Sequence, residues 1–438
     1  MSTRERRDRS NESDRFLSQL FHKAIQDLGE AELGKEIALA AVGGYGRGEL
    51  SPGSDLDILF IHSGRFSSEK LKALVNEVLY PLWDTKSVDH SVRTRSETRD
   101  AATSDLRVAT GLLDIRLISG NADLVANVQS DALELWRKNA KENLQELHKS
   151  LQERHTRAGE LAYLLEPDLK EARGGLRDIQ ALRAIALSGA VTVPLEKISW
   201  AESTLNNVRE TLHIASGRGK DRLLFQEQDK VADLLKYADA DAMMGDVARA
   251  ARSVDYLLDY TWHTLEHKGK DGLGRILKRP RVATVAKNVS ASNREIVIDP
   301  FTSLNDDPVV GLRAAATAAQ LGLPLSLDTC TELSEALKKG EGVLSNPWPR
   351  EARELLIALI GAGEAMVGIF EILDQEEIIF HWIPEWRGVR SLPQRNVLHR
   401  HTVDRHMVET AVSAAGLTRE VHRPDLLLFT ALFHDIGK

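Results

Sequence analysis

The sequence GGYGRGELSPGSDLDILF, residues 43–60, combines a glycine turn with two closely spaced aspartates. It follows the apolar run IALAAV, which predicts a buried strand that ends at Gly43 and Gly44. Glycine tolerates positive φ and has no side chain, so a ligand can approach the backbone amides closely. We expect residues 46–50 to open a short helix whose free N–H groups attract phosphate, with Arg47 as a fixed cation beside them.

The two aspartates lie in the sequence Ser54-Asp55-Leu56-Asp57, at the start of a second apolar run. Residues two apart on a strand project from the same face, so both carboxylates should face one site. Paired carboxylates can share divalent cations, and two metals held roughly 3.5–4 Å apart promote phosphoryl and nucleotidyl transfer. The hypothesis is a nucleoside triphosphate on the glycine turn and Ser54, with Mg²⁺ or Mn²⁺ on Asp55 and Asp57.

A third carboxylate would complete such a metal cradle. The alternating sequence SVDHSVRT, residues 87–94, predicts a strand that places Asp89 and Arg93 on one face. Asp114, in a run that predicts a helix, is the alternative, with an ion pair to Arg116 as its other role. We favour Asp89 because it lies on a strand.

The order of these features is more specific than any one of them. A strand, a glycine pair, a short helix and then SDLD on a second strand resemble the DNA polymerase β-like nucleotidyltransferase superfamily. The wording of residues 43–60 is similar to the GlnD family of PII uridylyltransferase/uridylyl-removing enzymes. The resemblance implies an α+β catalytic domain, a mixed β-sheet with flanking helices.

A long region, residues 122–268, has a nearly continuous helical pattern. Its main break is LEPDLKEARGGLRDIQ, where Lys170, Arg173 and Arg177 surround a predicted helix N-terminus. A triphosphate tail would suit Lys170 and Arg177 there. This segment resembles the EPxLKxxxGGLRD signature of the helical domain of the GlnD family, and VRETLHIASGRGKDRLLFQEQDKVA (208–232) is similar to that domain too.

The C-terminal part carries a second chemical signal. His406 lies in an amphipathic helical pattern, and an apolar run then delivers the doublet His434-Asp435. This pattern resembles the HD phosphohydrolase superfamily, whose imidazoles and carboxylate bind a metal and activate water. The sequence ends at Lys438, before a further HD aspartate or the glutamine-sensing ACT pair of the family. We therefore expect a fragment with an incomplete hydrolase site.

Composition narrows the class of protein. The 438 residues carry a net charge of −8, which argues against an extended nucleic-acid surface. The single cysteine, Cys330, rules out an intramolecular disulfide and suits a small buried side chain. The N-terminus is too charged for a signal peptide, and the longest apolar stretch, 355–370, is too short to span a bilayer. We expect a cytoplasmic protein.

The chain divides into segments by pattern. Residues 1–14 are polar and are expected to be mobile, followed by an amphipathic helix that caps the catalytic sheet. A small β-hairpin, turning at NVSASN, is expected within residues 281–300. The expected segments are a tail and capping helix (1–35), the nucleotidyltransferase domain (36–125), an all-α family domain with the hairpin (126–310), a helical connector (311–395) and the beginning of an HD-type helical domain (396–438).

The resemblance implies transfer of UMP from UTP to a tyrosine of the PII signalling protein, with release of pyrophosphate. The full-length protein would also remove UMP hydrolytically under control by glutamine. Three alternatives stay open: a PII adenylyltransferase that uses ATP, a transferase that extends tRNA ends, and a non-catalytic protein-binding sensor. Neither nucleic acid nor a membrane is an expected partner.

Overall fold

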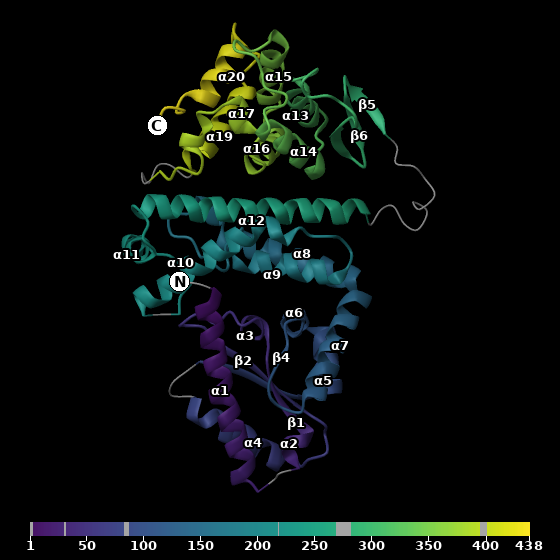
Figure 1. Cartoon of the computed structure of the whole chain (residues 1–438), viewed down its shortest axis with the longest axis vertical. Helices are drawn as coiled ribbons and strands as arrows, with labels where there is room; N and C mark the ends of the chain where they lie inside the picture. Colours follow the sequence, from purple (N-terminus) through teal and green to yellow (C-terminus); the bar gives the residue numbers. More distant parts are fainter. Residues whose placement is uncertain (1–2, 30–31, 83–86, 218, 269–281, 395–400) are drawn as a thin grey trace. The chain divides into compact units, whose positions relative to one another are not determined.

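The computed structural model describes residues 3–29, 32–82, 87–217, 219–268, 282–394 and 401–438. The chain divides into two compact units (Figure 1). The first joins Met1–Leu161 to Glu166–Met243, and the second joins Ala162–Leu165 to Met244–Lys438. Two elements contain residues of both units, the 3₁₀ turn η2 (Leu161–Tyr163) and helix α12 (Ala240–Lys268). The segment boundaries expected at 125, 310 and 395 stay predictions.

The first unit contains a four-stranded mixed sheet with the strand order β3-β2-β1-β4. Strand β1 pairs antiparallel with both β2 and β4, whereas β2 pairs parallel with β3. This sheet confirms the α+β class and the mixed topology that we expected for the catalytic domain. The strands are β1 (Ile37–Ala41), β2 (Leu56–His62), β3 (Val88–Thr94) and β4 (Arg116–Gly120).

Helices cover both faces of this sheet, because successive residues of β1 and β2 are apolar on both sides. On one face, Leu39 and Phe60 pack with Phe21 of α1 and with α4. On the other face, Leu59 packs with Val128 of α7. The capping role predicted for the first amphipathic helix is thus confirmed. The helices around the sheet are α1 (Thr3–Asp27), α2 (Leu33–Glu36), α3 (Gly43–Gly46), α4 (Ser68–Leu79), the 3₁₀ turn η1 (Tyr80–Leu82), α5 (Arg95–Ser104), α6 (Leu106–Leu112) and α7 (Ala122–Lys138).

Helix α1 begins at Thr3, so the expectation that residues 1–14 are mobile is wrong for the part of them that the structure describes. Arg6 is buried and lies 3.2 Å from the buried carboxylate of Glu210. Arg9 pairs with the same carboxylate at 2.7 Å and donates to the carbonyl oxygen of Leu50 at 2.6 Å. These ion pairs hold the polar N-terminal turns in place.

The remainder of the first unit is helical, as predicted. Helix α9 begins directly after the glycine pair at 174–175. The buried carboxylate of Asp178 accepts a 2.6 Å hydrogen bond from the backbone N–H of Gly174 and is also bound by Arg154 and His155. This closes the turn that precedes the helix. These elements are α8 (Ala140–Ala158), α9 (Leu176–Ser188), the 3₁₀ turn η3 (Leu195–Ile198), α10 (Ser199–Ser216) and α11 (Phe225–Leu235).

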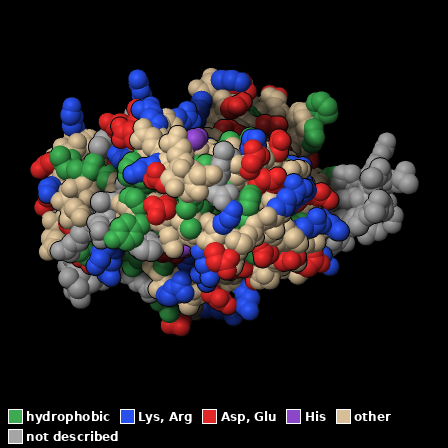
Figure 2. All heavy atoms as spheres, turned by 90° about the horizontal axis from the view of Figure 1, so that it is seen from below, with side chains coloured by type: hydrophobic (Ala, Val, Ile, Leu, Met, Phe, Trp, Pro, Cys, Tyr) green, Lys and Arg blue, Asp and Glu red, His purple; other side chains and the backbone are tan. Residues whose placement is uncertain are grey.

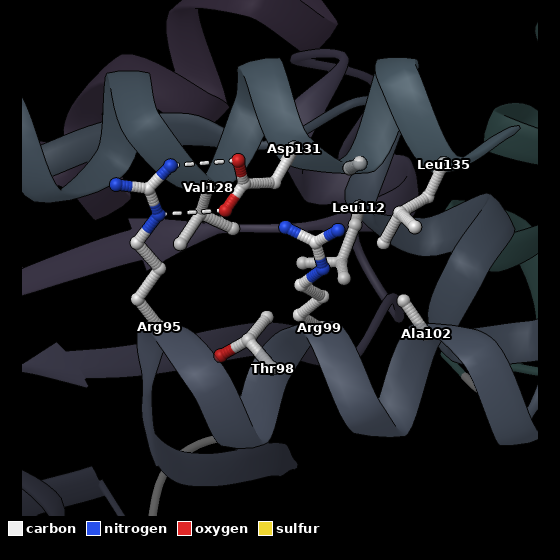
Figure 3. A pocket seen from close by; sticks show the side chains of 9 residues that line it. Arg95, Thr98, Arg99, Ala102, Leu112, Val128, Asp131 and Leu135 are labelled. Atoms are coloured by element: carbon white, nitrogen blue, oxygen red, sulfur yellow. Dashed lines mark hydrogen bonds and ion pairs between the residues drawn. The ribbon is translucent and has the colours of Figure 1, made fainter. Parts of the chain in front are cut away.

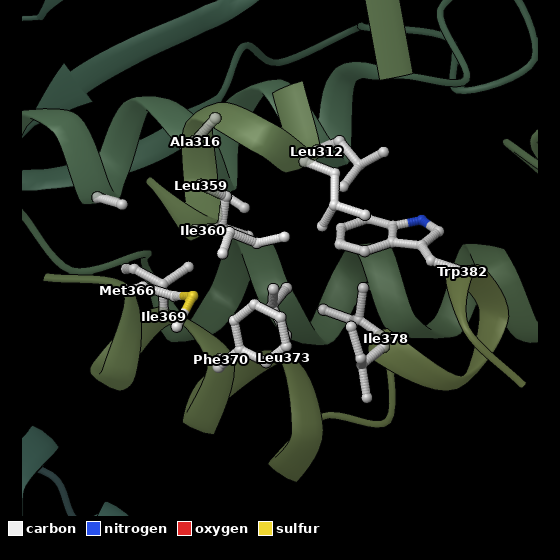
Figure 4. Close-up of a cluster of buried hydrophobic side chains, with 14 of the residues drawn as sticks. Leu312, Ala316, Leu359, Ile360, Met366, Ile369, Phe370, Leu373, Ile378 and Trp382 are labelled. Carbon is white, nitrogen blue, oxygen red and sulfur yellow. The ribbon is translucent and has the colours of Figure 1, made fainter. Parts of the chain in front are cut away.

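The second unit is organised around α13, most of whose residues are buried. Figure 4 shows Leu312 of α13 in one apolar cluster with Ile360, Phe370 and Trp382. Cys330 is buried in the same cluster, which confirms its expected packing role. The helices are α13 (Val310–Leu321), α14 (Leu327–Lys338), α15 (Arg350–Ile360), α16 (Glu364–Gln375), α17 (Ile379–Trp382), α18 (Trp386–Val389), α19 (Val403–Ala415) and α20 (Pro424–Phe433).

A three-stranded sheet in the second unit replaces the hairpin that we expected. Its strands, in the order β5-β6-β7, are β5 (Ala283–Ala286), β6 (Val289–Ser292) and β7 (Glu295–Ile298). The stretch NVSASN, predicted as a turn, forms the central strand instead, with Val289 and Ser290 buried. The turns lie at either end of it, where Asn288 and Asn293 adopt positive φ.

In the described part of the chain, no single helix is long and apolar enough to cross a membrane. One helix pair, α15 with α16, passes that test together by length and composition alone, and it is bent by 119°. On the face drawn in Figure 2, acidic and basic side chains alternate over the surface.

Candidate active site

The glycine turn follows β1 and forms the one-turn helix α3. The helix predicted at 46–50 was therefore misplaced, because α3 begins at Gly43 and ends at Gly46. Gly43 has φ +56°, a conformation that favours glycine. A Cβ atom on Gly46 would lie only 2.0 Å from the carbonyl oxygen of Asp114, so a side chain has no room there. In a helix that begins at Gly43, the first N–H groups lack intrahelical acceptors and can bind an anion.

Asp57 lies against this turn. A Cβ atom on Gly43 would be 3.5 Å from Oδ2 of Asp57, and the backbone N–H of Val42 donates to the carbonyl oxygen of Asp57 at 3.1 Å. The parallel pairing of β2 with β3 places Asp89 directly opposite Asp57. Both side chains therefore leave the same face of the sheet. The structure brings together the glycine turn and two of the three predicted carboxylates.

The carboxylates repel one another. Burial raises the pKa of Asp57. Repulsion by Asp89, and then by Asp55, raises this pKa further. Close carboxylates with a raised pKa suit a divalent cation, which would stabilise their ionised forms. As the described residues stand, however, these three aspartates do not form a group whose ligand oxygens all lie within 4.8 Å of one another.

Arg47 lies beside the turn, as expected, but its charge is compensated. A Cβ atom on Gly44 would be 3.7 Å from Nη2 of Arg47. The guanidinium is ion-paired with Glu49 at 2.8 Å and with Asp114 at 2.5 Å. Asp114 therefore pairs with Arg47 and is not the third carboxylate beside Asp57. It lies between α6 and β4 and not in the helix that we predicted.

The alternative partner that we considered for Asp114 was Arg116, and this was wrong. Arg116 pairs with Asp14 of α1 at 2.5 Å. The same Asp14 accepts a 2.7 Å hydrogen bond from the hydroxyl of Tyr45 in the glycine turn. Helix α1 thus buttresses the turn, a contact with no local sequence signal.

Lys170 and Arg177, from the loop before α9 and its first turn, provide positive charge at Asp57. Both residues lower its pKa and so offset part of the repulsion described above. Arg177 pairs with Glu171 at 2.6 Å, and Lys170 lies 3.9 Å from Asp221. The structure thus brings two cations predicted from the helical region to the aspartates of the sheet.

Ser54 lies in the turn that joins α3 to β2. Its hydroxyl oxygen accepts a 3.1 Å hydrogen bond from the backbone N–H of Ser51. The hydroxyl hydrogen is not used in that bond, so it can be donated to a ligand. Ser54 therefore stabilises the turn and retains the capacity expected of a nucleotide-binding residue.

His406, His434 and Asp435 gather in the second unit. Their ligand atoms all lie within 4.8 Å of one another, and the two Nε2 atoms are 3.3 Å apart. Metal–nitrogen bonds of about 2.1 Å in tetrahedral geometry would place two nitrogens roughly 3.4 Å apart. Nδ1 of His434 lies 2.9 Å from the carbonyl oxygen of Ala431, which assigns the proton to Nδ1 and leaves Nε2 to bind a metal.

This candidate metal centre has one competing cation. Nζ of Lys438 lies 2.6 Å from Oδ2 of Asp435. The hydrogen bond to Lys438 lowers the pKa of Asp435, which keeps the carboxylate ionised and able to bind a metal. A metal ion would have to displace this ammonium group. The HD identity of the segment stays a prediction, and its start falls within residues 395–400, outside the described residues.

Comparisons with known proteins agree with this geometry. The family model described as GlnD PII-uridylyltransferase matches residues 142–189 and 193–262, and a nucleotidyltransferase domain model matches residues 22–105. The chain is 44% identical to a bifunctional uridylyltransferase/uridylyl-removing enzyme of Streptomyces coelicolor, over 97% of this chain and 51% of the relative. The enzyme of the same name from Mycobacterium tuberculosis is 38% identical, over 92% and 50% of the two chains.

A third relative of that name, from Corynebacterium glutamicum, is 31% identical over 94% of this chain and 58% of its own length. The chain thus spans about half the length of the curated relatives it matches. The matches cover both the sheet domain with its glycine turn and the helices that bring cations to it. The chain belongs to the GlnD PII-uridylyltransferase family and carries a nucleotidyltransferase domain in its N-terminal part.

Proposed function

We propose that this chain transfers UMP from UTP to a tyrosine of a PII signalling protein and releases pyrophosphate. The observation that carries the proposal is the position of Asp57, which lies against Gly43 and directly opposite Asp89. A triphosphate on the turn would therefore lie next to a set of carboxylates. Uridine nucleotide and protein acceptor are proposed from the names of the relatives.

Asp55, Asp57 and Asp89 would hold Mg²⁺, for which Mn²⁺ could substitute. Carboxylate oxygens suit these hard cations, and the raised pKa of Asp57 marks a cluster of negative charge that a cation would stabilise. A bound divalent ion would neutralise charge on the phosphates and orient them for displacement.

The remaining groups of the site bind and orient the triphosphate. The backbone amides of Gly43 and Gly44, the hydroxyl of Ser54, and the cations of Lys170 and Arg177 would contact its oxygens. The tyrosine oxygen forms a bond to the α-phosphorus as the bond to pyrophosphate breaks, and the phenolic proton leaves to solvent. Positioning and charge neutralisation supply most of the acceleration.

The direct test is to incubate the chain with PII, Mg²⁺ and each of the four labelled nucleoside triphosphates. We expect label on PII from UTP, and its loss by about a hundred-fold or more in Asp57→Asn and Asp89→Asn. Asp114→Asn is the matched control. The carboxylate of Asp114 is ion-paired with Arg47, so this variant should retain most of the labelling. Labelling from ATP alone would overturn the nucleotide, and labelling of tRNA instead of PII would overturn the acceptor.

The removal of UMP is a proposal for the whole protein. His406, His434 and Asp435 would hold the metal that activates water, and the family resemblance suggests control by glutamine. A phosphodiesterase assay with Mn²⁺ on uridylylated PII tests whether this chain alone hydrolyses the bond. We expect turnover to be weak because Lys438 occupies Asp435. Strong turnover that is abolished in His434→Ala would show that the three residues are active in this chain.

A further inference from the structure

The turn that leads into Asp55 and Asp57 is docked on the helical region. A Cβ atom on Gly53 would lie 2.4 Å from Cα of Gly219, and one on Gly219 would lie 2.3 Å from the carbonyl oxygen of Gly53. The two backbones are therefore in contact, and neither position has room for a side chain. Gly219, the second glycine of GRGK in the segment 208–232, is therefore needed for this close backbone contact.

Two side chains of α10 form hydrogen bonds with the same turn. Nη1 of Arg209 donates to the hydroxyl oxygen of Ser51 at 3.0 Å, and the backbone N–H of Gly53 donates to Nδ1 of His213 at 3.4 Å. Since Nδ1 accepts, the ring proton lies on Nε2, which lies 2.8 Å from Oδ1 of Asp221 and donates to it. The contact between turn and helix therefore depends on the carboxylate of Asp221.

Asp221 connects these hydrogen bonds to Lys170. Its Oδ1 accepts from Nε of Arg209 at 2.6 Å, and its Oδ2 lies 3.9 Å from Nζ of Lys170. Its carbonyl oxygen accepts from the backbone N–H of Leu169 at 2.9 Å, and Leu223 donates to Pro167 at 2.9 Å. Both the backbone and the side chain of this segment thus fix the loop that presents Lys170.

We propose that Asp221 is a positioning residue for nucleotidyl transfer: it fixes Lys170 toward Asp57 and, through Arg209 and His213, holds the turn that precedes the catalytic aspartates. The inference rests on the proposed function for its substrate, a nucleoside triphosphate.

The geometry explains how the carboxylate of Asp221 can both orient Lys170 and hold the turn. Arg209 lies within hydrogen-bond distance of Asp221 and forms an ion pair with it. Lys170 is too far for a full hydrogen bond, so Asp221 orients its ammonium without saturating its donors. A flexible lysine loses considerable rotamer entropy on binding a phosphate, and prior orientation reduces that loss.

The test is the variant Asp221→Asn, which keeps the shape of the side chain and removes its charge. Binding of UTP with Mg²⁺ is measured by calorimetry, and PII labelling gives KM and kcat. We expect UTP binding to weaken by roughly ten-fold, as for other residues that orient a ligand-binding group. Most of the loss should appear in KM.

A double variant separates positioning from general damage. In a chain that already carries Lys170→Gln, Asp221→Asn should weaken UTP binding further by only about two-fold, because the group it orients is gone. Asp131→Asn is the matched control. The side chain of Asp131 is as little exposed as that of Asp221, 11% against 13%. It holds Arg95 at 2.6 and 2.7 Å between α5 and α7, as Figure 3 shows. It should leave UTP binding unchanged.

Equal, additive losses in the presence and absence of Lys170 would overturn the proposal. If Asp221→Asn does not fold, Ser51→Ala removes only the acceptor of Arg209 and should weaken UTP binding by about two-fold, the lower end for one hydrogen bond. Unchanged binding in that variant would also overturn it. A wild-type chain that binds UTP but does not label PII refutes the proposed function alone, whereas one that binds no nucleotide refutes both.

Discussion

The N-terminal helix provides the sharpest test of how the first unit is held together. Glu210 of α10 is fully buried, and its two carboxylate oxygens are shared between Arg6 at 3.2 Å and Arg9 at 2.7 Å. The variant Arg6→Met removes the more buried of the two cations and preserves an apolar stem of similar length. The buried carboxylate of Glu210 then keeps only one of these two cations, Arg9.

Removal of one partner from a buried ion pair typically costs 3–5 kcal/mol. Because Arg9 still pairs with Glu210, we expect the lower end, about 3 kcal/mol. For a unit of this size, 1 kcal/mol corresponds to a shift of about 2–4 °C in the melting temperature, so Arg6→Met should lower it by about 6–12 °C. Thermal unfolding followed by circular dichroism, with urea unfolding as a second measurement, gives both values.

The same helix offers a matched control. Arg4 pairs with Asp8 at 3.9 Å, and both side chains are largely exposed. Arg4→Met should therefore change stability by less than about 0.5 kcal/mol. Adding Glu210→Gln to Arg6→Met should recover part of the loss, because the uncompensated charge is removed. If Arg6→Met is no more destabilising than Arg4→Met, the ion pairs do not hold the helix.

Three further predictions concern single sites. Burial raises the pKa of Asp221, but the hydrogen bond from His213 and the ion pair with Arg209 outweigh it and lower the pKa to about 2, from 3.8. The shift corresponds to about 2 kcal/mol of stability, which is complete above about pH 5. In urea unfolding, Asp221→Asn should be less stable by that amount at pH 7, and the gap should close as pH falls from about 5 to about 2. Arg252→Met should destabilise the second unit by about 3–5 kcal/mol, because Arg252 compensates buried carboxylates on α16 and α19. Arg350→Met should have little effect, because the side chain of Arg350, at the start of α15, is exposed. His434→Ala should weaken Co²⁺ binding, followed by visible absorption, at least ten-fold, and undiminished binding would exclude its Nε2 as a ligand.

The sequence pattern predicted the catalytic sheet well because the signals are local. Strand β1 is a continuous apolar run, and β2 begins at the SDLD motif, so burial and the position of Asp57 follow from neighbouring residues. The glycine turn also has a local signal, because Gly43 adopts φ +56°, a conformation that favours glycine. Asp89 could be favoured as the third carboxylate from the alternation of its strand.

The errors arose where the deciding partner is distant in sequence. Residues 3–14 are polar enough to suggest disorder, but Glu210, which holds Arg6 and Arg9, is about 200 positions away. Arg47 looked like an available cation, but it pairs with nearby Glu49 and with Asp114, which follows only after two more strands. The hydrophobic periodicity of the sequence gives no signal for such ion pairs.

The stretch NVSASN failed for a different reason. Asparagine and serine favour turns, and that preference is satisfied, but at the ends of the stretch and not at its centre. Val289 and Ser290 are buried, and tertiary packing outweighs the weak propensity of the central residues.

The helical region is part of the proposed transfer site rather than an addition to it. The sheet supplies carboxylates whose mutual repulsion raises the pKa of Asp57, and the offsetting cations, Lys170 and Arg177, come from beyond residue 165. The turn that leads into these carboxylates rests on Gly219 and on α10, so the helices also set its backbone path. An anionic triphosphate brought to the sheet alone would meet carboxylates without these cations. In the proposed site, the GG–SDLD motif would therefore specify where the chemistry occurs, whereas the affinity for nucleotide would depend on residues that the motif does not contain.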